Sequence, residues 1–104
     1  MWLAYSVNGV PIRLTKERLE HIARRHPEIE DEHRILETLN NPDLVQQGDA
    51  GTLLAIKKFD KSPVTENKHL AVVYREATQQ DGFVLTAYYS STLRERLIIW
   101  KKKS

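Results

Sequence analysis

A histidine at the end of an amphipathic helix is the residue of this sequence best placed for acid–base chemistry. The segment LTKERLEHIARRHP, residues 14–27, has apolar side chains at helical spacing, and His26 is the last residue of that stripe. Because the unperturbed pKa of histidine lies near physiological pH, His26 could serve as a general base or a general acid. The alternative is a histidine that only completes the helix by bonding a backbone carbonyl.

The spacing of the histidines argues against a metal site. His21 and His26 are five residues apart, which places them about 140° apart around a helix, so they cannot share an ion as an i, i+4 pair would. His33 and His69 are isolated in sequence, and the chain has neither cysteine nor an HExxH pattern. The sequence therefore predicts no metal and no other cofactor.

Basic side chains occur in three parts of the chain. Arg24 and Arg25 could contact phosphate, although solvated charge on a helix surface explains them equally well. Lys57 and Lys58 interrupt an apolar segment, so one lysine must project from each face of a strand; lysine at a sheet edge also protects against aggregation. Lys101 belongs to a cationic C-terminal end, which suits a phosphate backbone or is merely a solvated tail.

Hydroxyl groups gather in the last third of the chain. Thr86 lies in an expected central strand, where a β-branched side chain can simply fill space. The run Tyr88-Tyr89-Ser90-Ser91-Thr92 brings five hydroxyls together. It could bind phosphate or sugar, although a strand end followed by turn residues has the same composition.

A histidine on a helix, basic residues and a hydroxyl-rich strand suit metal-independent cleavage of RNA. In that reaction the 2′-hydroxyl attacks its own phosphate. The reaction needs a base, a cation or hydrogen-bond donors for the charge of the phosphorane, and an acid for the leaving 5′ oxygen.

The composition indicates a single folded domain over residues 1–104. The chain is 40% hydrophobic and 29% charged, and its net charge of +2 is compatible with an anionic partner without arguing for one. It has no apolar run long enough to span a bilayer, and its N-terminus lacks the pattern of a signal peptide. We therefore expect no membrane association and a cytoplasmic location, which the absence of cysteine permits.

The helix that carries His26 must be positioned by the rest of the fold. Thr15 is a good N-cap for this helix, and Pro27 closes it. A hairpin precedes it, with a type I′ turn at Asn8-Gly9 and an edge strand marked by Pro11.

The remaining elements are expected to be one helix followed by strands. The helix is predicted over residues 31–40, and the strands over residues 44–47, 52–59, 69–75, 83–90 and 97–101. The short connections favour an antiparallel meander. The predicted fold is α+β, with an N-terminal β-hairpin and two helices packed on a four- to five-stranded antiparallel sheet.

Alternation along the strands suggests which side chains share a face. One consistent choice places eight residues against the helices: Leu54, Ile56, Ala71, Val73, Phe83, Leu85, Ala87 and Tyr89. The same choice leaves Lys57, Tyr74, Thr86 and Tyr88 on the open face.

Five segments give the chain a resemblance to a known superfamily. They are LTKERLEHIARRHPEI, ILETLNNPDLV, KHLAVVYRE, GFVLTAYYSS and the terminal IIWKK, and together they cover about residues 12–101. The chain resembles the small phage- and toxin-associated nucleases of the barnase–EndoU–colicin–RelE-like superfamily. That resemblance implies the same order of elements, two helices and then a four-stranded antiparallel sheet.

The resemblance also implies an active site. It would combine a helix-end histidine, a basic residue early in the sheet and Thr or Ser residues in the later strands. The expected catalytic residues are His26, Lys57 (or Lys58), Thr86 and Tyr74. The expected substrate-binding residues are Arg24, Arg25, Tyr88, Ser90, Ser91 and Lys101. Superfamilies of this kind tolerate different catalytic sets and include inactive members.

The function expected from these features is that of an endoribonuclease toxin without a metal, from a toxin–antitoxin or phage-linked system. Its partners would be RNA and an antitoxin protein. The alternative is a module of the same fold without catalysis, which binds RNA or another protein. A third option is that the acidic patch formed by Glu28, Glu30, Asp31 and Glu32 docks a basic partner.

Overall fold

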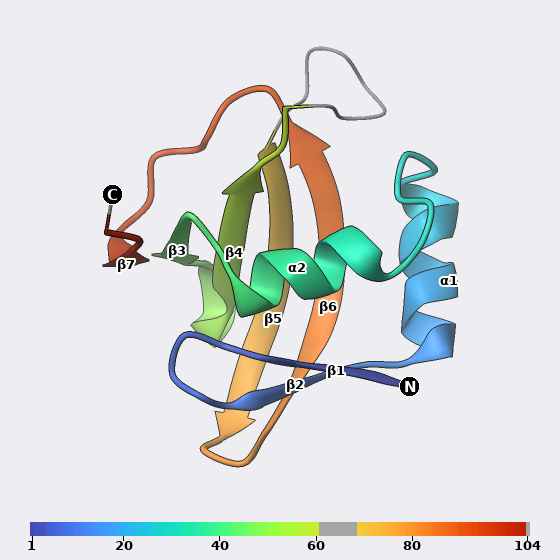
Figure 1. Cartoon of the computed structure of the whole chain (residues 1–104), viewed down its shortest axis with the longest axis horizontal. Coiled ribbons are helices and arrows are strands. Elements are labelled where there is room, and N and C mark those ends of the chain that lie inside the picture. Colours follow the sequence, from blue (N-terminus) through green and yellow to red (C-terminus); the bar gives the residue numbers. More distant parts are fainter. Residues whose placement is uncertain (61–68, 104) are drawn as a thin grey trace.

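The structure, a computed structural model, describes residues 1–60 and 69–103. It has the expected α+β composition, with helix α2 lying across one face of a sheet and helix α1 beside it (Figure 1). The elements in chain order are β1 (Trp2–Tyr5), β2 (Pro11–Leu14), α1 (Lys16–Arg25), α2 (His33–Asn40), β3 (Leu44–Gln47), the short 3₁₀ turn η1 (Asp49–Gly51), β4 (Leu53–Lys58), β5 (His69–Thr78), β6 (Asp81–Ser90) and β7 (Ile98–Lys101).

All seven strands belong to one open, mixed sheet in the order β1-β2-β6-β5-β4-β3-β7. Neighbouring strands pair antiparallel, except that β2 runs parallel to β6. The prediction of four or five antiparallel strands with a separate hairpin is therefore wrong in size and in pairing. The difference arises because β2 joins the sheet at only two residue pairs, Ile12–Gly82 and Arg13–Phe83. Such a long-range contact leaves no periodic signal in the sequence.

Helix α1 begins and ends where its capping residues require. The Thr15 hydroxyl accepts a hydrogen bond from the Arg18 amide at 3.0 Å, which satisfies one of the free donors of the first turn. At the other end the His26 amide donates to the Ile22 carbonyl at 2.8 Å, and Pro27 follows. Ile22 is fully buried where the helix packs along β6. The predicted position of His26 at the helix terminus is confirmed.

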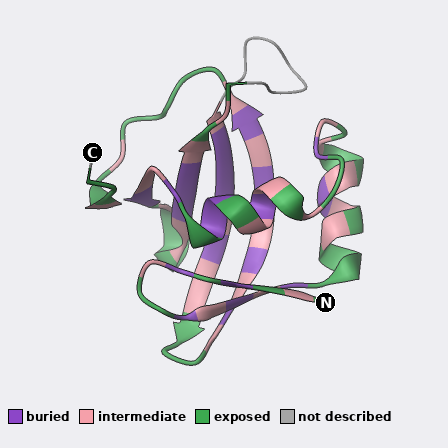
Figure 2. Cartoon of the chain, viewed as in Figure 1, coloured by how far each residue is buried: buried purple, intermediate pink, exposed green. Residues whose placement is uncertain are grey.

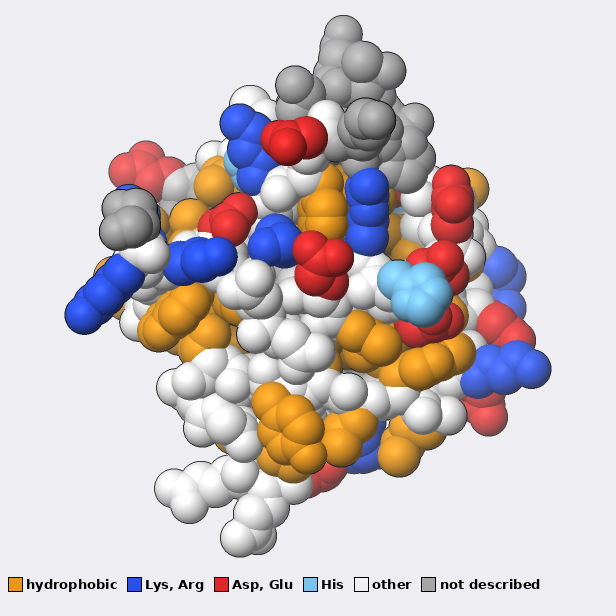
Figure 3. Space-filling view, in the orientation of Figure 1, with side chains coloured by type: hydrophobic (Ala, Val, Ile, Leu, Met, Phe, Trp, Pro, Cys, Tyr) orange, Lys and Arg blue, Asp and Glu red, His pale blue; other side chains and the backbone are white. Residues whose placement is uncertain are grey.

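Helix α2 covers one face of the sheet. It starts at His33, two residues later than expected, because Asp31 lies outside it and accepts a hydrogen bond from the His33 amide at 2.9 Å. Its own residues Ile35 and Leu39 are buried, and Figure 2 shows buried residues along the strands behind this helix. The outer surface on this side mixes acidic and basic side chains (Figure 3). Among the described residues, neither helix has the length and apolar character needed to cross a bilayer.

The two faces of the sheet hold separate apolar clusters. The helix face, which packs against α2 and Ile22 of α1, includes Leu70, Val72 and Tyr74 of β5. The open face holds Leu54, Ile56 and Ala71, with Tyr88 packed beside them. For β4 and β5 the expected assignment of faces is therefore wrong. Both alternating sets of these strands are apolar, so alternation alone does not say which set meets the helices.

The faces of β6 follow the prediction only toward its end. Ala87 and Tyr89 lie in the helix-face cluster, as expected, and Tyr88 lies on the open face. Nearer the start of the strand the register shifts, because Val73 pairs with Thr86 while the next residue, Tyr74, pairs with Val84. Leu85 is the extra residue of this β-bulge. In the residues of β6 before Leu85, the even-numbered and not the odd-numbered side chains therefore face the helices. Val84 is consequently the buried residue there, rather than Phe83.

The hairpin turn differs from the predicted type I′ turn. Gly9 has a φ of 77°, but Asn8 has no positive φ, so the two central residues do not have the required pair of left-handed conformations. The connection is longer, with the Ser6 amide donating to the Val10 carbonyl at 2.9 Å. Pro11 is the first residue of β2, which is an inner strand, and the edge strand is β1. Proline is tolerated there because it pairs only with Tyr5 of β1.

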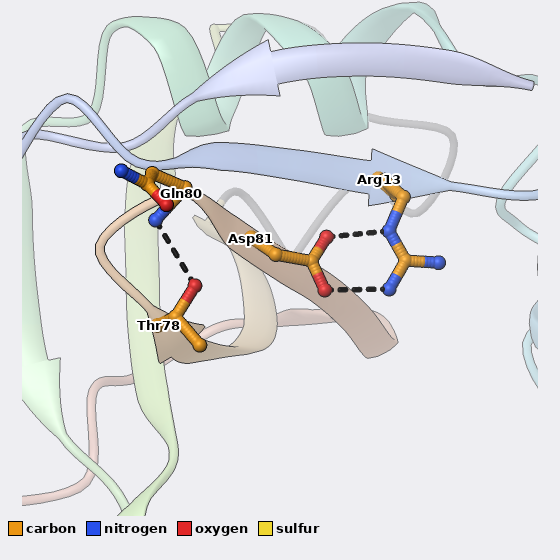
Figure 4. A network of polar contacts seen from close by, with 4 residues as sticks. All are labelled: Arg13, Thr78, Gln80 and Asp81. Carbon is orange, nitrogen blue, oxygen red and sulfur yellow. Dashed lines mark hydrogen bonds and ion pairs between the residues drawn. The ribbon is translucent and has the colours of Figure 1, made fainter.

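A close backbone approach and an ion pair fix the parallel junction between β2 and β6. A Cβ on Gly82 would lie 2.6 Å from both the Arg75 carbonyl oxygen and Ile12 Cδ1, so only glycine fits. Beside it, Arg13 Nε and Nη2 bind the two carboxylate oxygens of Asp81 at 2.7 and 3.0 Å (Figure 4). This paired hydrogen bonding raises the pKa of Arg13 and lowers the pKa of Asp81.

Candidate functional site

His26 lies at the boundary between α1 and the open face of the sheet. Its imidazole side chain is 33% exposed, with Nδ1 3.6 Å from Glu28 Oε1. Its ring centroid is 6.0 Å from that of Tyr88, and the two ring planes are tilted by 36°. The α1 terminus therefore presents a titratable, accessible ring to an aromatic residue of the open face.

Tyr88 connects His26 to a pocket on the open face. Tyr88 pairs across the sheet with Ala71. Ala71, Leu54 and Ile56 together form the apolar floor of the pocket. The pocket has a volume of about 360 Å³ and is also lined by the segment between β6 and β7. One side of the Tyr88 ring thus meets a histidine outside the pocket, while the residue itself lines the pocket.

Polar side chains surround this apolar floor. Those lining the pocket are Gln46, His69, Tyr88, Ser90, Thr92, Arg94 and Arg96. They come from β3, β5, β6 and the segment between β6 and β7, elements far apart in the sequence that the sheet brings together.

The contacts within this set hold the β6–β7 segment over the floor. Gln46 is buried and donates from Nε2 to the Arg94 carbonyl at 3.2 Å. The Ser90 hydroxyl donates to the Thr92 carbonyl at 2.6 Å, which turns the chain out of β6. Arg96 Nη1 lies 3.3 Å from Asp49 Oδ1, and its guanidinium side chain is only 15% exposed. These contacts place the side chain of Arg96 and the backbone of Arg94.

The pocket lining suits an anion. Two arginines, a histidine and several hydroxyls line it, and no carboxylate is among the described lining residues. Arginine presents a planar array of donors that matches the oxygens of a phosphate. With an apolar floor below and an aromatic ring at its side, the pocket can accept a ligand that is part flat and apolar and part anionic.

Two of the expected catalytic residues lie on the other face. Tyr74 is 1% exposed in the helix-face core, where burial, with a smaller effect of Glu76, raises its pKa. Lys57 also faces the helices, and its Nζ donates to the Asn41 carbonyl at 3.1 Å and lies 4.0 Å from Glu37 Oε2. The expectation that Lys57 and Tyr74 share a face with Tyr88 is wrong, because the faces of β4 and β5 are reversed.

The other expected residues are distributed around the open face. Tyr88 and Ser90 line the pocket, as described above, whereas Thr86 is half-buried and lies outside the lining. Arg24 and Arg25 are exposed in the last turn of α1, next to His26. Ser91 is exposed directly after β6.

Lys101 is distant from His26. It is exposed on β7, the edge strand, four strands along the sheet from β6. At about 4.8 Å per strand this separation is on the order of 20 Å, so the two residues cannot contact the same phosphate.

Sequence reasoning missed four polar residues of the lining: Gln46, His69, Arg94 and Arg96. His69 is isolated in the sequence, and the two arginines belong to the same cationic C-terminal end as Lys101. One available signal was the expected antiparallel pairing of the 69–75 and 83–90 strands, which can bring His69 opposite the hydroxyl run. The structure pairs His69 with Ser90. Nothing in the sequence pattern indicated that the β6–β7 segment returns over the sheet.

A group with metal-ligating side chains occurs elsewhere among the described residues. Ligand atoms of Asp31, Glu32 and His33 lie within 4.8 Å of one another at the start of α2. Asp31 and His33 are exposed, and the group shares no residue with the open-face pocket. Exposed acidic groups of this kind are common without an ion, so this group adds nothing to the candidate site.

Comparison of the chain with models of protein families, with curated proteins and with solved structures finds no match. Function must therefore be argued from the site.

Proposed function

We propose that this protein is a metal-independent endoribonuclease, acting as the toxin of a toxin–antitoxin or phage-linked system. One observation carries the proposal. His26 lies against Tyr88, and Tyr88 lines a pocket that holds two arginines and no carboxylate among its described residues. This arrangement combines a group that can transfer protons with cations that can hold a phosphate.

The proposed reaction transfers a phosphoryl group within the RNA strand. A base removes the proton of the 2′-hydroxyl, and the resulting oxygen attacks the adjacent phosphorus. The bond from phosphorus to the 5′ oxygen of the next nucleotide breaks, and an acid protonates that leaving oxygen. The products are a 2′,3′-cyclic phosphate and a free 5′-hydroxyl. Cations close to the phosphate stabilise the charge of the phosphorane.

The residues take the following roles in this proposal. His26 acts as the base that takes the proton of the 2′-hydroxyl and then as the acid that gives a proton to the leaving 5′ oxygen, since it is accessible and next to the open face. Arg94 and Arg96 stabilise the phosphate, and Tyr88 offers a ring for a base to stack on. Arg24 and Arg25 contact the RNA backbone beside His26. Lys57 and Tyr74 have no part, because they face the helices.

The test is cleavage of RNA by the purified chain in the presence of EDTA. Because general acid–base catalysis contributes about 10²–10⁴-fold, His26→Ala should lower the rate by that factor while the circular dichroism spectrum is unchanged. His21→Ala is the matched control, a half-buried histidine of the same helix, and should retain the wild-type rate. Cleavage by His26→Ala at the wild-type rate, or no cleavage by the wild type, would refute the proposal.

The toxin assignment needs its own experiment. Expression of the chain alone should arrest bacterial growth and degrade cellular RNA, whereas His26→Ala should do neither. Growth arrest with intact RNA would indicate a different target. Normal growth with the wild-type protein present at high level would refute the assignment to a toxin.

A separate observation favours a protein-binding role as the second candidate. The edge strand β7 and the residue before it expose three apolar side chains: Leu97, Ile98 and Ile99 are 66%, 47% and 46% exposed. An edge strand with exposed apolar side chains is a template for pairing with another chain. Such a surface could dock an antitoxin, or it could be the sole function of a module without catalysis. In the second case RNA would be recovered intact under all conditions.

A further inference from the structure

Two buried nitrogen atoms of residues that line the open-face pocket have no hydrogen-bond partner among the described residues. They are His69 Nδ1 and Arg96 Nε. Both residues line the pocket, and in the described part of the chain only one further buried side-chain atom, Thr38 Oγ1, lacks a partner. Burying a polar atom without a partner costs free energy, so such atoms in a folded protein call for an explanation. Two of them in one pocket point to a ligand that supplies the acceptors.

The charge around these atoms defines the ligand's polar end. Arg96 is held by Asp49 through Nη1, while its Nε has no partner among the described residues, and Arg94 adds a second guanidinium to the lining. No carboxylate is among the described lining residues, so an anion that enters the pocket meets no like charge from its lining. The oxygens of a phosphate would accept from Arg96 Nε and from His69 Nδ1 in the tautomer that carries its hydrogen there.

The floor of the pocket defines the ligand's other end. Leu54, Ile56 and Ala71 offer an apolar surface, and Tyr88 adds an aromatic ring. A free phosphate would leave this surface uncovered. A nucleobase would cover it, since bases stack on aromatic rings and pack on apolar side chains. The volume of about 360 Å³ is of the size that encloses a small organic ligand.

We infer that this pocket binds one nucleoside monophosphate unit, with its phosphate on His69 and Arg96 and its base against Tyr88 and the apolar floor. The inference deepens the ribonuclease proposal and rests on it for the identity of the substrate as RNA. It adds a subsite next to the scissile bond, because His26 meets Tyr88 from outside the pocket. The nucleotide held in the pocket would be one of the two joined by that bond.

The inference is tested by calorimetric titration of the full chain with each of the four nucleoside 3′-monophosphates, with the matching nucleosides and with inorganic phosphate. At least one monophosphate should bind about tenfold or more tighter than both its nucleoside and inorganic phosphate, because base and phosphate contacts combine. Equal affinity for inorganic phosphate would overturn the inference, since it would reduce the pocket to an anion site. The absence of any binding would overturn it as well.

Substitutions then locate the binding site. His69→Gln and Arg96→Gln should each weaken the monophosphate about tenfold, because each removes one charge-assisted bond. Lys57→Gln is the matched control, a partly buried cation of the helix face, and should bind as the wild type does. If Arg96→Gln fails to fold, Arg96→Lys keeps the charge but lacks Nε and should still bind more weakly than the wild type. Wild-type affinity in both the His69 and Arg96 variants would overturn the inference.

The same experiment separates this inference from the ribonuclease proposal. His26→Ala should bind the monophosphate with wild-type affinity although it cleaves RNA far more slowly, because His26 lies outside the pocket lining. Nucleotide binding that requires His69 and Arg96, in a protein that cleaves no RNA, would refute the ribonuclease and leave the pocket assignment standing. Cleavage that requires His26, in a protein that binds no nucleoside monophosphate at His69 and Arg96, would do the reverse.

Discussion

The two faces of the central sheet are built by the same strands, yet they differ in whether their polar side chains have hydrogen-bond partners. On the helix face, Lys57 bonds the Asn41 carbonyl, and Arg34 bonds the Tyr89 hydroxyl at 3.1 Å and lies 4.4 Å over the ring of Phe59. On the open face, His69 and Arg96 keep buried atoms without partners among the described residues. The charged side chains named on the helix face are bonded within the fold, whereas His69 and Arg96 on the open face each keep an atom that a ligand can engage.

This contrast indicates which face of the sheet in a small α+β chain is the place to look for a functional site. Successive side chains of a strand point to opposite faces of the sheet. A polar residue in a strand therefore indicates a site only once its face is known. Tyr74 and Tyr88 illustrate the point, since both are tyrosines of central strands. One is sealed in the helix-face core, and the other lines an accessible pocket.

Replacing these two tyrosines should give the largest contrast. Tyr74→Ala removes a fully buried aromatic ring and should lower the free energy of unfolding by about 3–5 kcal/mol. Tyr88→Ala removes a half-buried ring and should cost only about 1 kcal/mol, while RNA cleavage falls. Urea unfolding measures the first quantity. Equal destabilisation by both substitutions would mean that the faces do not differ in this way.

The junction between the hairpin and the sheet should give the next largest effect. Gly82→Ala places a Cβ 2.6 Å from the Arg75 carbonyl and from Ile12, and should lower the free energy of unfolding by about 1–3 kcal/mol. Gly9→Asn serves as the control, since its Cβ would meet nothing within 4 Å and asparagine tolerates a positive φ. Equal stability of the Gly82 variant and the wild type would show that β2 does not approach β6 this closely.

Removing a cation from the helix face should lower stability, whereas removing one from the open face should lower the rate of RNA cleavage. Lys57→Ala should cost about 0.5–1.5 kcal/mol by breaking its bond to Asn41, and RNA should still be cleaved at the wild-type rate. Arg96→Gln should reduce cleavage instead. Thermal unfolding and cleavage assays on both variants check this pair. Loss of cleavage in Lys57→Ala, with the fold retained, would show that Lys57 takes part in cleavage although it faces the helices.

The smallest expected effect is a pH dependence at the hairpin junction. Because the hydrogen bond from Arg13 lowers the pKa of Asp81 in the folded state, the pair stabilises the fold above the unfolded pKa of about 4. That contribution is lost as the pH falls through the lower folded value. Wild-type protein should therefore lose slightly more melting temperature between pH 7 and pH 2.5 than Asp81→Asn does. An identical loss in both proteins would show that the exposed pair contributes nothing.

Local features of the fold could be predicted from the sequence. Thr15 and Pro27 delimit α1 because capping and the restriction before proline act within a few residues. The strands from residue 44 onward were expected within a few residues of their observed ends, since apolar segments between turn residues define them. These features depend on neighbours along the chain.

Features that depend on contacts across the fold could not be predicted in the same way. The parallel pairing of β2 with β6 joins residues about 70 positions apart, and its signals, Gly82 and the Arg13–Asp81 pair, are ordinary residues in the sequence. The apolar character of both sheet faces hid the orientation of Tyr74 and Lys57, and the bulge at Leu85 hid that of Val84. His26 and Tyr88 were singled out from the sequence, whereas His69 and Arg96 needed the pairing of β5 with β6 and the return of the chain over the sheet.

The most direct test of the central claim, that the open face and not the helix face meets RNA, is a chemical-shift titration. The ligand is a short RNA whose 2′-hydroxyls are methylated, so that it binds without being cleaved. The largest shifts should fall on His26, His69, Tyr88 and Ser90, with the signals of Lys57, Tyr74 and Tyr89 unmoved. Shifts that cluster on the residues of the helix face, or no shifts at all, would contradict the account.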